Sequence, residues 1–241
     1  MRPFSTITGL ACPLPMSNID TDQIIPARFL RRPRAEGYAI CLFHDLRFDA
    51  DGQPSDFPLN QPAYAASEIL LAGRNFGGGS SREGAVYALI DFGIRVVIAP
   101  SFGDIFAANA VKNGLLLAQV TQADLQGLLA TEELLAAQPV SVDLGRQIIA
   151  RGNLVVPFSI DPVSKHQLET GQDDIDLTLA HAGLIDAFCV EDRKARPWAA
   201  APEPAAGASA SSSAFGAPEY RARCRPGRRL ARDSEPRPGS G

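Results

Sequence analysis

A short loop rich in glycine, serine and arginine is the part of the sequence most able to do chemistry. Residues 75–83 read NFGGGSSRE. Contiguous glycines allow tight turns, and a helix that follows them presents free N–H groups and the positive end of its dipole. Arg82 adds a forked donor set that suits a carboxylate. The loop therefore predicts an anion site. It is neither a Walker loop, because no Gly-Lys-Ser/Thr follows, nor a dinucleotide fingerprint, because the glycines are contiguous.

Ser80 in this loop has two interpretations. In the structural one, Ser80-x-x-Glu83 is a capping box that serves only the start of a helix. In the functional one, Arg82 and the helix dipole favour the alkoxide of Ser80, which takes a proton from a substrate carbon. A Ser-His-Asp triad is not expected, because no histidine has a partner at a useful spacing. The histidines are His44, His166 and His181.

A second polar cluster lies near the N-terminus. Residues 18–26 read NIDTDQIIP, and four arginines follow at positions 28, 31, 32 and 34. One interpretation is an Asx-rich turn before a strand, with a solvated basic loop behind it. In the other, two aspartates beside four arginines form a lip that orients an anionic substrate. The residues alone leave both open.

The elements that must position these loops alternate between strand and helix. The apolar run Ile69–Ala72 predicts a buried strand before the glycine loop, and residues 81–92 predict the helix after it, ended by Gly93. Strands at 96–99 and 115–120 and helices at 101–113 and 121–130 continue the order, which favours an α/β layer with a parallel core. The other expected elements are β segments at 4–11, 140–144, 147–150 and 154–160, and a helix at 175–191.

Composition divides the chain into two parts. Residues 1–192 carry 13 basic and 23 acidic side chains, whereas residues 193–241 carry 10 and 4. Residues 197–241 hold one Leu and no Ile, Val or Met, too little apolar surface to offset the entropy of ordering. We predict one domain at 1–192 and a disordered Ala/Pro/Ser/Arg-rich tail at 193–241. The tail lacks aromatic–basic periodicity, so no nucleic-acid partner is expected.

Several functional classes are excluded by what the sequence lacks. No run approaches the ~18 apolar residues of a transmembrane helix, so no membrane partner is expected. The N-terminus does not read as a signal peptide, and the expected location is cytoplasmic. The cysteines are too sparse for a disulfide framework or a metal-ligand set, so this chain is expected to bind no metal or cofactor. They are Cys12, Cys41, Cys189 and Cys224.

Several motifs together resemble one family. Residues 18–26, 75–83 and 101–106 (SFGDIF), with further matches at 42–48 and 173–179, are similar to the small subunit of 3-isopropylmalate dehydratase (isopropylmalate isomerase). The similarity runs in order over residues 4–191. It implies an α/β fold, a β/β/α swivelling domain like the mobile C-terminal domain of aconitases.

The resemblance also implies an activity and a partner. The family interconverts 2- and 3-isopropylmalate through isopropylmaleate in leucine biosynthesis, as a heterodimer whose large subunit holds a [4Fe–4S] cluster. Ser80 would be the catalytic base for this small dicarboxylate, and Arg82, with Ser81 beside it, would hold a substrate carboxylate. Asp22 would lie on the wall of the site, and Thr21 and Arg28 are expected to bind substrate as well.

Two positions depart from the family pattern. Where the family usually reads GCGSSREH, this chain has Gly78 in place of Cys and Gly84 in place of His. Two alternatives therefore stay open. One is the small subunit of a related hydro-lyase acting on homoaconitate, citraconate or another alkylmalate, which the loop at residues 24–34 would discriminate. The other is a catalytically impaired assembly subunit.

Overall fold

The computed structural model describes residues 2–130 and 138–199. The chain divides into two compact units, Met1–Phe188 and Cys189–Gly241. Most of the tail predicted to be disordered, residues 200–241, lies outside the described residues, so its disorder stays a prediction.

The described strands form two four-stranded sheets. The parallel sheet has the order β2-β3-β4-β5, and the apolar runs of β3 and β4 are buried on both faces, as is typical of parallel sheets. Its strands are β2 (Ala11–Leu14), β3 (Ile69–Ala72), β4 (Val96–Ala99) and β5 (Leu116–Gln119). The antiparallel sheet has the order β1-β6-β7-β8: β1 (Thr6–Gly9), β6 (Val140–Asp143), β7 (Ile148–Arg151) and β8 (Leu154–Pro157).

The predicted β segment at residues 4–11 is wrong as a single strand. Its first part is β1, whose side chains alternate between exposed and half-buried, while β2 begins at Ala11 and is almost wholly buried. The two strands belong to different sheets, and the chain passes between them at Leu10. The change from alternating to nearly continuous burial at Ala11 marks the point where the chain enters the second sheet.

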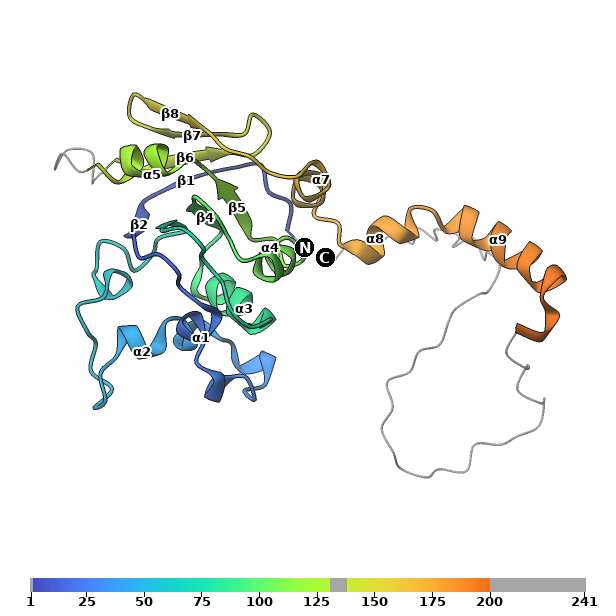
Figure 1. The fold of residues 1–241 in the computed structure, drawn as a ribbon, viewed down its shortest axis with the longest axis horizontal. Coiled ribbons are helices and arrows are strands. Elements are labelled where there is room, and N and C mark those ends of the chain that lie inside the picture. The colour runs from blue at the N-terminus through green and yellow to red at the C-terminus, as the bar shows by residue number, and fades with distance from the viewer. Residues whose placement is uncertain (1, 131–137, 200–241) are drawn as a thin grey trace, which may run out of the picture. The chain divides into compact units, whose positions relative to one another are not determined.

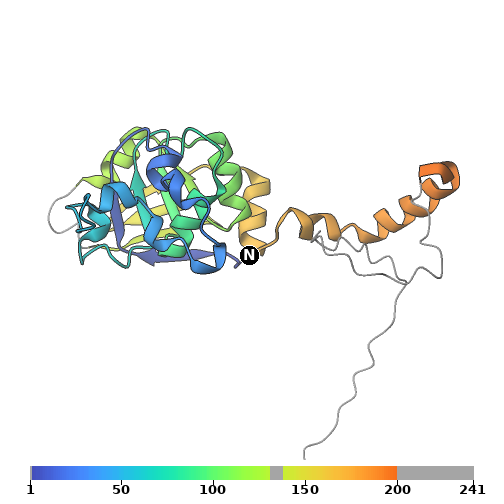
Figure 2. The same cartoon turned by 90° about the horizontal axis from the view of Figure 1, so that it is seen from below.

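Alternate residues of the parallel strands build two separate cores. Ile69 and Leu71 of β3 belong to a core shared with Val142 of the antiparallel sheet. Leu70 and Ala72, which point to the opposite face, belong to a second core with helix residues. The result is a layer of antiparallel sheet, a layer of parallel sheet and a layer of helices, which confirms the predicted β/β/α class; Figure 1 shows the layers, and Figure 2 views the helices from below.

The helices follow the predicted order with shifted ends. The larger ones are α3 (Glu83–Phe92), α4 (Asp104–Lys112), α5 (Gln122–Leu129), α7 (Pro162–Thr170) and α9 (Ala182–Ala195). The short ones are α1 (Thr21–Ile24), α2 (His44–Arg47) and α8 (Asp174–Leu179). Single 3-10 turns cover Ala27–Phe29, Arg34–Glu36, Ala39–Cys41, Pro58–Asn60 and Pro197–Ala199. The helix expected at 175–191 is interrupted between α8 and α9, and α7 was not expected.

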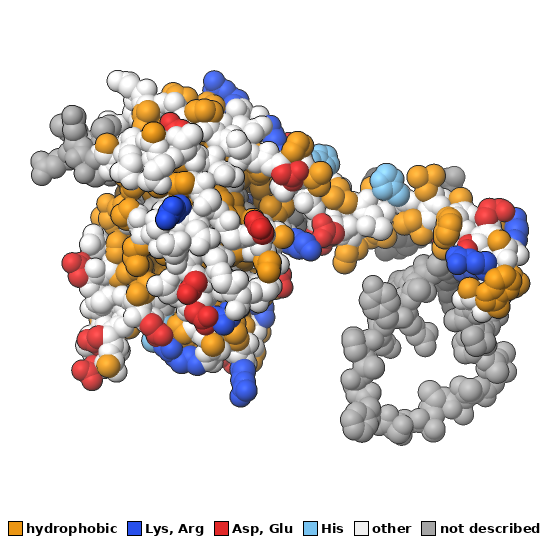
Figure 3. All heavy atoms as spheres, viewed as in Figure 1, with side chains coloured by type: hydrophobic (Ala, Val, Ile, Leu, Met, Phe, Trp, Pro, Cys, Tyr) orange, Lys and Arg blue, Asp and Glu red, His pale blue; other side chains and the backbone are white. Residues whose placement is uncertain are grey.

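Helices α8 and α9 carry exposed apolar side chains. Ile175, Leu179, Leu184 and Phe188 are each at least 60% exposed, and hydrophobic atoms are visible along this segment in Figure 3. None of the helices in the described ranges is long and apolar enough to cross a membrane.

Candidate active site

Three sequence motifs that are far apart in the chain meet at the carboxyl end of the parallel sheet. In the glycine loop after β3, the Gly77 amide donates to the Ile19 carbonyl (2.7 Å) and the Phe76 amide donates to the Ser101 carbonyl (3.1 Å). Parallel bridges pair Asp20 with Gly78 and Phe76 with Phe102. The loops after β2, β3 and β4 therefore continue the ladder of the sheet, at the edge where α/β proteins place their ligand sites.

Two glycines, Gly77 in the glycine loop and Gly103 before α4, lie too close to their neighbours to carry a side chain. Gly77 has φ +74°, and a Cβ on it would lie 2.3 Å from Cγ of Phe106 in α4. A Cβ on Gly103 would lie 2.5 Å from the Gly77 carbonyl oxygen. Glycine at both positions is therefore a requirement of close approach, and the loop is fixed against the start of α4.

Ser80 is not a helix cap, so the capping-box interpretation is wrong. Helix α3 begins at Glu83, with Arg82 as its extended N-cap and no side-chain cap. The Glu83 carboxylate accepts a hydrogen bond from Nδ2 of Asn113 (2.9 Å) instead of reaching back to Ser80. Ser80 and Ser81 are exposed in the segment that precedes the helix. Their hydroxyls are therefore placed beside a helix N-terminus, where negative charge is stabilised.

The aspartate-rich cluster forms a short helix, not a turn before a strand. Asp20 is the N-cap of α1, and its carboxylate accepts from the Gln23 amide (2.8 Å) while the Gln23 side chain accepts from the Asp20 amide (3.0 Å). The next residue, Thr21, is 1% exposed, and its hydroxyl donates to the carbonyl oxygen of Ser80 (2.8 Å). The structure thus brings Thr21 and Ser80 together.

Asp22 and Arg82 form an ion pair across the same two loops. Nη1 of Arg82 is fully buried, and its side chain as a whole is 17% exposed, whereas that of Asp22 is 53% exposed. A buried guanidinium needs a counter-charge, and Asp22 supplies it.

Arg28 is placed differently from these residues. Its guanidinium forms an ion pair with Asp45, contacts Nδ1 of His44 (3.1 Å) and lies over the ring of Phe29. The hydrogen bond from Arg28 lowers the pKa of Asp45 to about 2.

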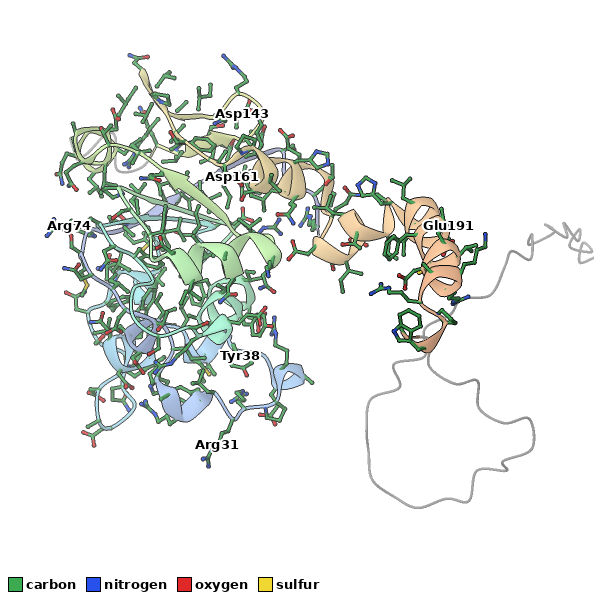
Figure 4. The ribbon with its side chains drawn as sticks, turned by 45° about the vertical axis from the view of Figure 1, so that its right-hand side comes forward. Arg31, Tyr38, Arg74, Asp143, Asp161 and Glu191 are labelled. Carbon is green, nitrogen blue, oxygen red and sulfur yellow. The ribbon has the colours of Figure 1, made fainter. Side chains whose placement is uncertain are left out.

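Other arginines of the same loop also bind residues of this chain. Arg34 binds both carboxylate oxygens of Asp91 and lies over the ring of Tyr87, and Arg32 donates to the Gly37 carbonyl (2.9 Å). Arg31 points away from the fold (Figure 4). Asp91 was not predicted from the sequence. It lies in the last turn of α3, where a negative charge interacts unfavourably with the helix dipole, and this position indicates a basic partner.

At Gly78 and Gly84, the two positions that depart from the family motif, neighbouring side chains lie close to the backbone. A Cβ on Gly84 would meet Cδ2 of Leu30 at 3.2 Å and Cδ1 of Ile25 at 3.6 Å. A Cβ on Gly78 would lie 3.1 Å from the Asn75 amide group. The Cβ position at each glycine is therefore already in contact with neighbouring side chains, and Leu30 of the loop of residues 26–38 lies on the first turn of α3.

The described residues do not include three His, Cys, Asp or Glu side chains grouped as metal ligands. Cys12 and Cys41 are buried, and burial raises the pKa of the Cys12 thiol to about 12. A thiol with a raised pKa is a poor source of the thiolate that iron–sulfur clusters bind. The donor set found here does not fit a [4Fe–4S] cluster.

The fold and this site define the class of an aconitase-type C-terminal domain, and the family model described as "Aconitase C-terminal domain" matches residues 1–123. Two relatives named 3-isopropylmalate dehydratase small subunit are each 48% identical: one from Jannaschia sp. (strain CCS1), over 82% of this chain, and one from Rhodopseudomonas palustris (strain BisB18), over 83%. Both are covered over 100% of their own length. A crystal structure of 3-isopropylmalate dehydratase from Methanocaldococcus jannaschii matches with a TM-score of 0.55 and 27% identity, over 76% of this chain and 98% of that one.

The chain belongs to the family of 3-isopropylmalate dehydratase small subunits. This confirms the resemblance seen in the motifs.

Proposed function

We propose that this chain is the small subunit of a 3-isopropylmalate dehydratase, a hydro-lyase that interconverts 2- and 3-isopropylmalate through isopropylmaleate in leucine biosynthesis. The observation that carries the proposal is the meeting of three loops at one sheet edge, which places exposed Ser80 and Ser81 beside Arg82 at the start of α3. A serine and an arginine at a helix N-terminus suit a substrate that carries carboxylates and must lose a carbon-bound proton.

In this proposal Ser80 takes the proton from the substrate carbon. Arg82 binds a substrate carboxylate, and Ser81 lies beside it as a further hydrogen-bond donor. The positive end of α3 and the charge of Arg82 stabilise the deprotonated serine. Loss of hydroxide needs an electrophile, and the [4Fe–4S] cluster expected on the large subunit supplies one. We propose that this chain acts only in a heterodimer with that subunit, in the cytoplasm.

The contacts of the loop at residues 26–38 favour an aliphatic substrate group. Arg28 and Arg34 each place both terminal guanidinium nitrogens on the two oxygens of one carboxylate, Asp45 and Asp91, so their forked edge is already occupied within the fold. Leu30 packs over Gly84, two residues from Arg82 along the chain, and is 40% exposed. An apolar residue beside the anion site suits the isopropyl group of the substrate.

One observation favours a second candidate. Within the described residues Arg31 has no ion pair, its side chain extends away from the fold (Figure 4), and an unpaired guanidinium can bind an additional carboxylate. A related hydro-lyase acting on a homoaconitate-like substrate would supply such a third carboxylate.

The test is anaerobic co-purification with the large subunit, followed by an ultraviolet assay for the unsaturated intermediate. We expect turnover of 3-isopropylmalate by the complex and none by this chain alone. A higher kcat/KM for homoaconitate would select the second candidate, and a complex that is inactive with every alkylmalate would contradict the hydro-lyase proposal.

A further inference from the structure

The segment Asp20–Asp22 contacts the glycine loop (residues 75–83) at every second residue from Gly78 to Arg82. The Thr21 amide donates to the Gly78 carbonyl (3.0 Å), and the Thr21 hydroxyl donates to the Ser80 carbonyl (2.8 Å). The Asp22 carboxylate pairs with the guanidinium of Arg82. Positions 78, 80 and 82 of the loop are thus held in turn by two consecutive residues of α1.

The hydrogen bond from the Thr21 hydroxyl to the Ser80 carbonyl leaves Thr21 without a proton to donate to a substrate. A threonine hydroxyl has one proton to donate, and Thr21 donates it to the Ser80 carbonyl. With 1% of its surface exposed, Thr21 is also closed off from solvent. The contact instead fixes the peptide group of Ser80, and with it the direction from which the serine side chain leaves the backbone.

The ion pair between Asp22 and Arg82 also positions a residue of the glycine loop. The buried Nη1 of Arg82 faces Asp22, and a guanidinium presents donors along more than one edge. A carboxylate on one edge holds the group in place and leaves another edge for a second carboxylate.

The segment itself is well anchored. Asp20 closes a capping box with Gln23, and the Ile25 amide donates to the Thr21 carbonyl (3.0 Å). Ile19 and Ile24, on either side of the contacts, are fully buried. The donors of Thr21 and the carboxylate of Asp22 therefore come from a rigid base, which is what a positioning function requires.

We propose that Thr21 and Asp22 are positioning residues: Thr21 sets the backbone of the base Ser80, and Asp22 orients Arg82 for the substrate carboxylate. This inference rests on the proposed function, and it differs from the sequence-based expectation that both residues bind substrate themselves.

Asp22 is tested by a double-mutant cycle with Arg82, measured on the purified heterodimer. Asp22→Asn should raise KM for 3-isopropylmalate roughly tenfold and Arg82→Lys about ten- to a hundredfold, the range expected for a hydrogen bond to a charged group. If Asp22 acts through Arg82, the double variant should be little worse than Arg82→Lys alone, because coupled residues are not additive. Asp45→Asn is the matched control, since it removes the carboxylate of an ion pair outside these loops, and KM should not change.

Thr21 is tested by two substitutions with opposite consequences. Thr21→Val keeps the shape and removes the hydroxyl, and kcat should fall at least tenfold with KM within about twofold. Thr21→Ser keeps the hydroxyl and should restore kcat to within about threefold of the wild type. Melting temperature and co-purification with the large subunit show whether each variant folds and assembles.

The outcomes separate this inference from the function on which it rests. Additive effects of Asp22→Asn and Arg82→Lys, or equal kcat for Thr21→Val and Thr21→Ser, would overturn the positioning roles while leaving Ser80 and Arg82 in theirs. An Arg82→Lys variant with unchanged KM would overturn both.

Discussion

Two arginine-bearing loops lie near the start of α3, and they use the same side chain in opposite ways. Arg82 is 17% exposed and pairs with Asp22, a half-exposed carboxylate on the neighbouring loop. Arg28 is 51% exposed and pairs with Asp45, which lies outside the three motif loops. The first arginine is held at the sheet edge where the motifs meet, and the second fastens its own loop to α2. Under the proposed function, burial and a partner on the neighbouring motif loop distinguish Arg82, which binds substrate, from Arg28, which does not.

The largest effect on this comparison is expected from Ser80→Ala. Loss of a general base typically costs 10²–10⁴-fold in rate, so turnover by the heterodimer should fall by at least about a hundredfold while the subunits still co-purify. The Ser80 hydroxyl makes no contact that the helix needs, so melting temperature should hardly change. Wild-type turnover in this variant would show that Ser80 is not the general base.

The second test replaces each arginine with lysine. Arg82→Lys should raise KM for 3-isopropylmalate about ten- to a hundredfold, because hydrogen bonds to charged groups contribute about 1.5–3 kcal/mol and lysine cannot bind a carboxylate with a fork. Arg28→Lys is the matched control, and its KM should stay within about twofold. Equal increases in KM for both variants would show that Arg28 also binds substrate and that the two loops do not differ in this respect.

Gly84, where the two loops touch, gives a smaller effect. Gly84→Ala should gain up to about 1 kcal/mol of helix propensity, but its Cβ would press on Leu30 at 3.2 Å. We expect an unchanged or higher melting temperature and a KM that rises a few-fold. Gly127→Ala is the control, because Gly127 also lies in a helix and its Cβ would meet only Leu154, at an ordinary 3.4 Å. A KM that is equal in the two variants would show that Leu30 does not contact substrate.

The smallest effect concerns the ion pair that fastens the second loop. Asp45 has a pKa lowered to about 2 in the folded chain, so its contribution to stability is complete above about pH 4 and is lost as the pH falls toward 2. Both side chains are about half exposed, so solvent screens the pair. Asp45→Asn should lower the melting temperature at pH 7 by no more than about 2 °C, and the difference should shrink by pH 3. A difference that grows on acidification would contradict the assignment.

The parallel core was predictable because its signals are local. The runs ILLA and VVIA are each followed by a polar loop and a helix, and both became central strands. The motif loops and their meeting at one sheet edge follow from that topology. Helix α7 was equally accessible: Asp161 caps it, Pro162 occupies its first turn and Gly171 ends it.

Other features depend on contacts that no local pattern contains. Ser80 and Glu83 have the spacing of a capping box, yet the hydrogen bond from Thr21 holds the Ser80 backbone and Asn113 takes the Glu83 carboxylate. The pairings of Arg28 with Asp45 and of Arg34 with Asp91 are likewise tertiary. Sequence therefore indicated which residues lie near the site and could not assign what each one contacts.

The division of residues 4–11 between two sheets bears on how the chain folds. β1 pairs with β6, with Thr6 opposite Asp143, while β2 pairs with β3, with Ala11 opposite Ile69. The N-terminal segment leaves the ribosome first, yet β1 can find its partner only after most of the domain has been synthesised. Pairing over such sequence distances is slow, and until it occurs β6 presents an open edge of the kind that promotes misassembly. Completion of the antiparallel sheet is therefore expected to be a late step in folding, because it requires β1, the first strand synthesised, to pair with β6.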